Sequence, residues 1–202
     1  MADDLTSSRA ALLDLKAERT VMQEGHAFLD EKRTLLAAEM IQQLKRYYAV
    51  HTHQQDRYQA ALEALKQALA RHGLEGLQCY PASANPGELH KQHHYLMGVP
   101  LAAIYLQTNP AQPSDTVATL TPEAETCRQH WQALLADLVD LASLQANLLR
   151  LYDDYVQTER RTRALEDVLI PELDEQIATM DSALEALELE EAVRVRGAGR
   201  VK

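Results

Sequence analysis

Two apolar rows run through the last third of the chain at steps of seven residues. They consist of Ile170, Ile177 and Leu184, and of Leu173, Met180 and Leu187. Offsets of three and four residues between two such rows form the a and d seam of a coiled coil. A seam this narrow is buried only when a second helix covers it. Residues 160–191 are therefore predicted to be one half of a coiled coil.

The N-terminal third supplies the partner helix, which is predicted to run from about Leu5 to His72 and to stop at Gly73. One of its rows consists of Leu15, Met22, Leu29, Leu36, Gln43 and Val50. The other row is mixed in polarity and consists of Leu12, Arg19, His26, Arg33, Met40 and Tyr47. Charged members weaken a seam but fix its register. At 1.5 Å per residue this helix would be about 100 Å long, too long for a globular domain.

Residues 74–121 interrupt the heptads and are rich in proline and glycine, which favours loops and turns. We expect a loop over residues 80–87, an apolar strand over Met97–Leu106, a turn over residues 109–115 and a return strand over Thr116–Leu120. Two strands are marginally stable alone, so this hairpin should lean on the helices.

A second long helix is predicted to begin at Pro122, after Thr121 as its cap, and to run to about residue 196. The predicted fold is all-α, a long antiparallel two-helix coiled-coil hairpin with a small loop and β-hairpin insert. Facing residues should have numbers that add up to about 194. We expect one domain overall, made of an N-terminal helix (1–73), the insert (74–121), a C-terminal helix (122–196) and a flexible tail (197–202).

Composition and charge argue against several classes of function. Only one Phe and one Trp occur in 202 residues, which suits long helices better than a sheet-built core. The net charge of −10 argues against nucleic-acid binding, because phosphates require a basic face. Two cysteines, Cys79 and Cys127, are too few for a disulfide framework and suggest a cytosolic protein. No signal sequence or apolar run of membrane-spanning length is evident, so direct membrane insertion is not expected.

A proline and a glycine stand out within the predicted helices. Pro171 should break or kink its helix and free the carbonyl of Asp167. Gly25 falls near residues 169–171 in the predicted register, where the missing side chain would let a kinked partner approach closely. A mid-helix glycine costs about 1 kcal/mol, which calls for such a local reason.

Five cations should lie at one level of the coiled coil: Lys32, Arg33, Arg160, Arg161 and Arg163. Like charges repel each other, so acidic partners are expected. Either the interleaved carboxylates, such as Asp30 and Glu159, pair with these cations inside the chain, or an acidic surface of another protein does.

No catalytic, cofactor-binding or metal site is predicted. The chain lacks the G-x-x-x-x-G-K-[ST] loop of phosphate-binding subunits. His90, His93 and His94 read as a hydrophilic loop, because a zinc site needs four convergent ligands. His26 is more consistent with a packed seam position than with a proton relay. Cys127 is more consistent with an inert thiol than with a reactive one.

The sequence nevertheless resembles a known family, the D subunits of the V-type and A-type rotary ATPases. The N-terminal helix carries Leu15-Lys16 and then Gly25-His26-Ala27-Phe28-Leu29-Asp30-Glu31-Lys32-Arg33, similar to the family's G-x-x-L-L-K-x-K-R. The insert carries Met97-Gly98-Val99, and the C-terminal helix carries Arg160 to Glu166 followed by Ile170-Pro171, similar to R-R-V-N-A-L-E and I-P. Arg163 stands where the family usually has Asn, and residues 189–193 replace a more basic and aromatic ending.

The resemblance implies a non-catalytic rotor shaft. Its termini would reach into a ring of catalytic A and B subunits, while the F subunit and the cap subunit of the membrane rotor ring would bind its middle. Rotation of a curved shaft would couple ATP turnover to ion flow, and the shaft would be cytoplasmic, peripheral to the membrane and without a cofactor. The basic cluster would meet acidic loops of the catalytic ring. The segment from Arg160 to Pro171, with Leu165, Glu166 and Ile170, would be where the shaft meets that ring.

The main alternative is a free-standing coiled-coil adaptor or scaffold. Copurification separates the two hypotheses, because a shaft should bring down A, B and F subunits and an adaptor should not. An F-type shaft is a less suitable match, since it carries a larger sheet-bearing domain than residues 74–121 could supply.

Overall fold

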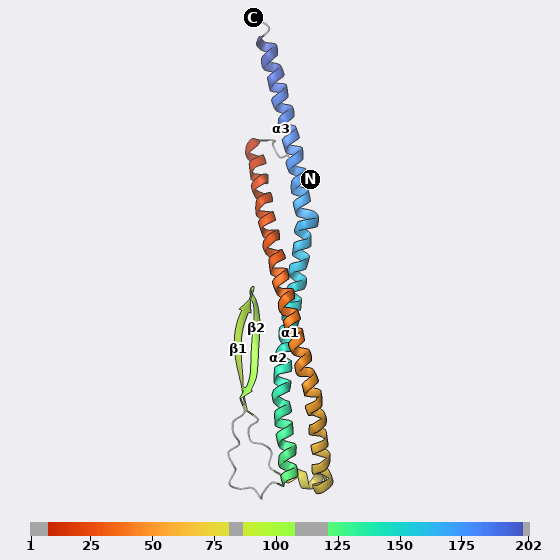
Figure 1. The fold of residues 1–202 in the computed structure, drawn as a ribbon. Coiled ribbons are helices and arrows are strands. Elements are labelled where there is room, and N and C mark those ends of the chain that lie inside the picture. The colour runs from red at the N-terminus through yellow and green to blue at the C-terminus, as the bar shows by residue number, and fades with distance from the viewer. Residues whose placement is uncertain (1–7, 81–86, 108–120, 200–202) are drawn as a thin grey trace. The chain divides into compact units, whose positions relative to one another are not determined.

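The computed structural model describes residues 8–80, 87–107 and 121–199. Its elements are α1 (Arg9–Gln78), β1 (Glu88–Leu96), β2 (Val99–Gln107), α2 (Pro122–Ala164), a π-helical turn η1 (Leu165–Leu169) and α3 (Ile170–Gly199) (Figure 1). The predicted fold class, two long helical stretches joined through a small β-hairpin, is confirmed. Contacts divide the chain into two units, residues 1–35 with 155–202 and residues 36–154, and each is described by itself. That the chain acts as one domain stays a prediction.

Both predicted rows of α1 are buried or half-buried at every position, which confirms the heptad pattern. The rows continue in step beyond the predicted members to Ala61, Ala64 and Ala68, which are at most 7 % exposed. The helix breaks at Gly73, as predicted, because its φ of 67° and ψ of 172° are not helical. A further helical stretch to Gln78, which the sequence did not reveal, follows this break.

Ion pairs between the helices confirm the antiparallel register. In residues 36–154, Arg57 pairs with Asp137 and Arg71 with Glu123, and both pairs of numbers add up to 194. In the other unit the numbers of Arg33 and Glu159 add up to 192. The predicted register is therefore correct to within a helical turn.

The closed end of the helix pair is built around Thr121. Its carbonyl accepts the hydrogen bond of Glu125 N at 3.0 Å, so α2 begins at Pro122 as predicted. Its hydroxyl lies 2.7 Å from Nε2 of His72, the last residue before the break in α1. These contacts tie the end of one helix to the start of the other.

The hairpin differs from the prediction in its pairing. The predicted strand over Met97–Leu106 corresponds to β2, but its antiparallel partner is the preceding segment β1. Met97 and Gly98 form the two-residue turn with φ of 47° and 87°, the positive values that a type I′ turn requires. The polar segment around His93 reads as a loop in the sequence because β1 is largely exposed and lacks an apolar alternation. The predicted turn over residues 109–115 and the return strand over Thr116–Leu120 lie outside the described residues.

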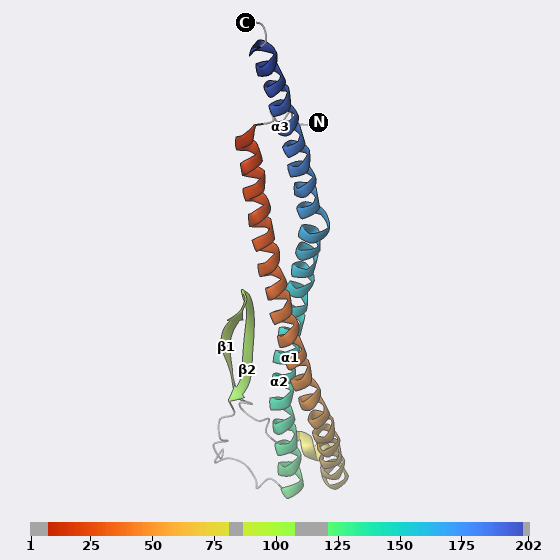
Figure 2. The ribbon, with the colours of Figure 1, turned by 45° about the horizontal axis from the view of Figure 1, so that its top comes forward.

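Of the two strands, β2 is the one on the side of α2 (Figure 1 and Figure 2), and side chains of α2 hold its free edge. Asn147 accepts a hydrogen bond from Ala102 N at 2.9 Å and donates one to Ala102 O at 2.8 Å. Ser143 donates to the same carbonyl at 2.8 Å and accepts from Ile104 N at 3.2 Å. This explains why two polar residues of α2 are buried, and it satisfies an otherwise unpaired strand edge.

The helix is not broken at Pro171, but it is disturbed directly before this residue, as the predicted break or kink allows. α3 begins at Ile170 and continues through Pro171, whose ring nitrogen carries no hydrogen to donate to the preceding turn. The irregularity lies just upstream in η1, where Ile170 N donates to Leu165 O, five residues back. α3 also extends to Gly199, past the predicted end at residue 196.

The π-helical turn compensates for an extra residue in the heptads. Leu151, Thr158 and Leu165 are spaced by seven, but Leu173, the next buried position of that row, follows eight residues later. Thr162 and Ile170 show the same step of eight. A π-turn takes up one more residue than an α-turn, so the seam stays on one side of the helix across η1.

Candidate functional site

All ten predicted site residues lie in the unit formed by residues 1–35 and 155–202. There α1 runs antiparallel to the end of α2, to η1 and to the start of α3. The residues are Gly25, Lys32, Arg33, Arg160, Arg161, Arg163, Leu165, Glu166, Ile170 and Pro171. The structure shows that they are not equivalent.

Arg33 is the centre of an ion-pair network across the two helices. Its Nη1 donates to Glu159 Oε2 at 2.8 Å, and its Nη2 donates to Asp30 Oδ1 at 2.5 Å. Glu159 also accepts a hydrogen bond from Nε of Arg163 at 2.8 Å. Of the predicted basic cluster, Arg33 and Arg163 are thus neutralised inside the chain.

The network shifts the ionisation of its members. The hydrogen bond from Arg33, supported by the one from Arg163, lowers the pKa of Glu159 below its usual value. The hydrogen bond to Glu159 raises the pKa of Arg33. Both shifts favour the charged pair over its neutral form.

Arg160 and Arg161 behave differently from Arg33. Both are exposed, and neither forms an ion pair with another residue in the described part of the chain. Lys32 is half-buried. The cations that remain available for an external acidic surface are therefore Arg160 and Arg161.

The seam beside this network is built from small hydroxyl residues. Thr158 and Thr162 are 3 % and 1 % exposed, and the Thr162 hydroxyl donates to Thr158 O at 3.0 Å. That hydrogen bond satisfies a buried polar group within the helix. Sequence reasoning missed both residues, although the seven-residue spacing of Thr158 from Leu151 and Leu165 was a visible signal.

His26 and Glu166 meet at η1. His26 is half-buried in its row, and its Nε2 lies 3.8 Å from Glu166 Oε2. Leu165, the first residue of η1, and Ile170, the residue directly after it, are half-buried, whereas Glu166 and Pro171 are exposed. Of the segment from Arg160 to Pro171, some residues therefore pack in the seam and others lie on the surface.

Gly25 does not serve a close approach of the helices, contrary to the prediction. A Cβ built on Gly25 meets no atom within 4 Å. The register placed this glycine near the proline correctly, but packing within the chain leaves the space open. No contact among the described residues requires a glycine there.

A row of exposed apolar side chains on α1 also escaped the sequence reasoning. Val21, Phe28 and Leu35 are 62 %, 57 % and 41 % exposed, and they recur at steps of seven. Residues seven apart lie on the same side of a helix, so they form one strip away from the seam. Their spacing was visible in the sequence, but the strip coincides with neither predicted row.

Metal binding, thiol reactivity and membrane insertion can each be examined in the described residues. Over the ranges 8–80, 87–107 and 121–199, no three His, Cys, Asp or Glu side chains converge as a metal site would require. Burial raises the pKa of the Cys127 thiol, which disfavours the reactive thiolate. In the same ranges no helical stretch combines the length and the apolar character needed to cross a bilayer.

Comparison with known proteins agrees with the resemblance found in the sequence. The family model that describes the D subunit of ATP synthase matches residues 11–198. The chain is 29 % identical to the V-type ATP synthase D subunit of Anaeromyxobacter dehalogenans over 195 residues, which covers 94 % of this chain and 93 % of the relative. It is 27 % identical to the A-type ATP synthase D subunit of Methanosarcina acetivorans over 200 residues, with 96 % and 94 % covered. For the A-type D subunit of Thermococcus sibiricus the identity is 24 %, with 94 % and 90 % covered. With its paired helices, its hairpin and a match over nearly its whole length, the chain belongs to the family of ATP synthase D subunits.

Proposed function

We propose that this chain is the central-stalk, or rotor, subunit of a V-type or A-type ATPase. In this role it couples ATP hydrolysis or synthesis in a ring of A and B subunits to ion translocation through the membrane ring. It catalyses no reaction and holds no cofactor. The observation that carries the proposal is the match to the D-subunit family over residues 11–198. It is supported by the seam of α1, which keeps step from Leu12 to Ala68 and is joined to the partner helix by ion pairs in both units.

Such a seam suits the transmission of torque. Interlocked a and d side chains resist rotation of one helix against the other, and charged seam members such as Arg33 fix the register. A force applied to one helix is therefore shared by both. A coiled-coil adaptor would have the same seam, but it would not explain family membership over residues 11–198.

Contact with the A and B subunits is proposed for residues 1–35 and 155–202. The exposed strip of Val21, Phe28 and Leu35 offers an apolar surface, and the exposed Arg160 and Arg161 offer positive charge. Exposed apolar side chains together with available cations are suited to partner loops with mixed apolar and acidic side chains.

The F subunit is proposed to bind an apolar patch in residues 36–154. Ile41, Leu44 and Tyr48 of α1 and Leu149 and Tyr152 of α2 are between 42 % and 61 % exposed. In the register set by the Arg57–Asp137 pair, Leu44 lies level with Leu149 and Ile41 with Tyr152. The patch therefore spans both helices. The cap subunit of the membrane ring would bind elsewhere and hold the assembly at the cytoplasmic side of the membrane, without insertion of this chain.

The proposal is tested by purifying the assembly through an affinity tag on this chain. A rotor subunit should bring down A, B and F subunits in a complex that hydrolyses ATP. Membrane vesicles that contain this complex should pump ions with ATP, and vesicles from a strain that lacks the chain should not. Recovery of the chain without A and B subunits would favour the adaptor.

The contribution of Arg160 and Arg161 is tested within the same complex. Reversing both charges (Arg160→Glu with Arg161→Glu) should weaken assembly or lower coupled ATP turnover, because the mutant repels the acidic partner. The control variant, Arg160→Lys with Arg161→Lys, keeps both charges and should behave like the parent. Normal assembly and turnover of the charge-reversed complex would rule out this contact.

A further inference from the structure

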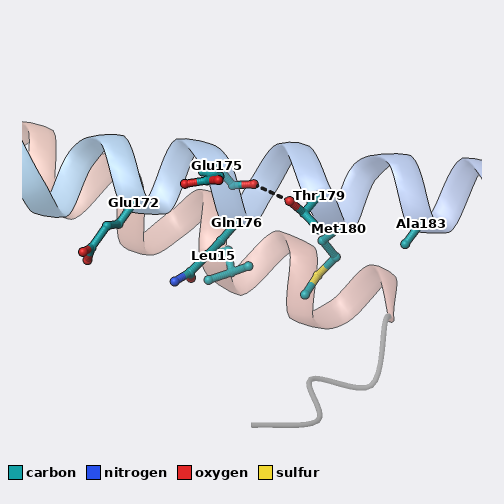
Figure 3. Close-up of a pocket in the computed structure, with 7 residues that line it drawn as sticks. All are labelled: Leu15, Glu172, Glu175, Gln176, Thr179, Met180 and Ala183. Atoms are coloured by element: carbon teal, nitrogen blue, oxygen red, sulfur yellow. Dashed lines mark hydrogen bonds between the residues drawn. The ribbon is translucent and has the colours of Figure 1, made fainter. Parts of the chain in front are cut away.

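A groove runs between α1 and α3 on one side of the unit formed by residues 1–35 and 155–202. Its apolar floor consists of Leu15 from α1 with Met180 and Ala183 from α3 (Figure 3). Glu172 and Glu175 line it with Gln176 and Thr179, and the Thr179 hydroxyl donates a hydrogen bond to Glu175 O at 2.8 Å. None of the seven lining residues is a Lys or an Arg.

The two flanks of this coiled coil differ in charge. On one flank, three acids of α3 that are spaced by seven, Asp174, Asp181 and Glu188, pair with cations of α1. Their partners are Arg19, Lys16 and Arg9, respectively. On the groove flank, by contrast, Glu172 and Glu175 are exposed and form no ion pair with any residue of the described ranges.

The flanks also differ in side-chain size. The seam of α3 is formed by the two rows that begin at Ile170 and Leu173. The residues that flank this seam on the side of the groove are Gln176 and Ala183. These are a neutral amide and a small methyl, so no long charged side chain of α3 folds over the seam from these positions. Met180 is 6 % exposed beneath them. The result is an apolar floor that opens to solvent beside carboxylates without a cationic partner in the described chain.

We propose that this groove receives a cationic segment of one nucleotide-binding subunit, with an aliphatic side chain on the floor and Lys or Arg side chains on Glu172 and Glu175. The occupant is chosen by charge complementarity, because the groove offers carboxylates and no cation. The inference rests on the proposed rotor function, for which it names the chemistry of one contact. A second copy of this chain is a poor occupant, since its α3 carries the same excess of acids.

The one-sided position of the groove has a functional consequence. A ring of alternating subunits surrounds a rotor on all sides, but a groove on a single flank can engage only one subunit at each angle. The cationic contact would therefore be broken and remade as the shaft turns, and it would contribute a barrier or a preferred angle at each step. Exposed ion pairs are individually weak, which suits a contact that must be released.

The occupant can be identified by photo-crosslinking in the purified complex. A photoreactive amino acid replaces Thr179, which is exposed and lines the groove. A second complex carries it instead at Phe28, on the exposed strip outside the groove. We expect the Thr179 probe to capture a peptide of an A or B subunit that contains Lys or Arg.

The two probes separate failure of this inference from failure of the rotor proposal. If the Phe28 probe captures A or B subunits while the Thr179 probe captures none, or captures only an acidic peptide, the groove proposal is wrong and the rotor proposal stands. Capture of a second copy of this chain at Thr179 would also overturn it. If neither probe captures a nucleotide-binding subunit, the rotor proposal itself fails.

Charge reversal supplies the functional test. Glu172→Lys with Glu175→Lys should change the ATP turnover of the complex by about threefold to tenfold, the effect of losing two exposed ion pairs. The matched control, Glu185→Lys with Glu191→Lys, alters the same net charge at exposed α3 residues outside the groove. The difference between the groove variant and the parent should shrink in about 1 M salt, where the Debye length is about 3 Å. Equal effects of both variants, or no salt dependence, would contradict a specific cationic contact.

Discussion

At the residue scale, Gly25→Ala is the substitution whose effect on the stability of the fold is simplest to predict. Its added Cβ would meet nothing within 4 Å, so Gly25→Ala gains helix propensity without a clash. We expect about 1 kcal/mol of added stability and a melting temperature about 2–4 °C higher, measured by circular dichroism.

Gly87 provides the matched control for that substitution. A Cβ on Gly87 would lie 2.6 Å from Gln107 O, and the φ of 125° is unfavourable for other residues. Gly87→Ala should therefore lower the melting temperature. If Gly25→Ala also lowers it, the packing around Gly25 is tighter than the structure indicates. If Gly25→Ala stabilises the chain but impairs the complex, a partner occupies the open space.

The stabilising effect of Glu159 should depend on pH. Hydrogen bonding to Arg33 lowers its pKa in the folded chain, so the unfolded chain binds more protons as the pH falls. The stabilisation is complete above the unfolded value of about 4.5 and is lost as the pH falls through the lower folded value. Urea unfolding of the parent and of Glu159→Gln should show a stability gap at neutral pH that closes in acid. A gap that stays constant down to the lowest accessible pH would contradict this assignment.

At the element scale, the extra residue taken up by η1 indicates that a one-residue deletion should be tolerated there. In a Pro171→Ala chain, where the proline no longer opposes an α-helix, deletion of Val168 should restore steps of seven from Leu165 to Leu173. We expect this deletion to cost less than about 1 kcal/mol in urea unfolding. Val168 is 48 % exposed, so little buried surface is lost with it.

Deletion of the exposed Ala178 in the same background is the control. It shifts Met180 off the seam relative to Leu173, and burial of the following apolar residues is lost. The expected cost is at least about 2 kcal/mol. Equal costs of the two deletions would show that η1 does not compensate for an extra residue.

The hairpin should depend on Asn147 more than on apolar contacts. Asn147→Leu leaves the N–H and the carbonyl of Ala102 with fewer partners at a site that is 2 % exposed. An unsatisfied buried group costs about 1–3 kcal/mol, so the Ala102 amide should exchange with solvent faster. Hydrogen exchange of β2 amides measures this, and Gln145→Leu at an exposed position of α2 should leave the exchange unchanged. Unaltered exchange in Asn147→Leu would mean that other contacts hold the hairpin.

At the scale of the whole molecule, the apolar patch in residues 36–154 should determine the affinity for the F subunit. Leu44→Glu with Tyr152→Glu places two charges in the patch and should weaken binding by about tenfold or more, as measured by calorimetry. Leu74→Glu is the control, because Leu74 is 65 % exposed but lies outside the patch. If the control weakens binding as much as the double variant does, the F subunit binds elsewhere.

The sequence predicted those parts of the molecule that depend on repeating spacing. The heptad rows follow from the spacing of apolar residues, and the break at Gly73 and the start at Pro122 follow from local helix start and stop signals. The antiparallel register follows from the positions of these two helix ends. The pairing of β1 could not be predicted, because an exposed strand such as that around His93 carries no apolar alternation. The seam row of α1 already turned Arg33 towards the partner helix, but its pairing with Glu159 and the exposure of Arg160 depend on the exact register, which the sequence does not set.

The antiparallel register also sets the order in which the chain can fold. The residues that pair across the helices are 52 apart for Arg71 with Glu123, 80 apart for Arg57 with Asp137 and 126 apart for Arg33 with Glu159. Loop closure costs more for longer loops, so pairing should start at the closed end and spread like a zipper towards the termini. During synthesis the first helix then emerges with its seam uncovered, and the seam stays uncovered until nearly the whole chain has been made. The residues closest to the N-terminus are made first and paired last, which gives chaperones their longest access to Leu12 and its neighbours.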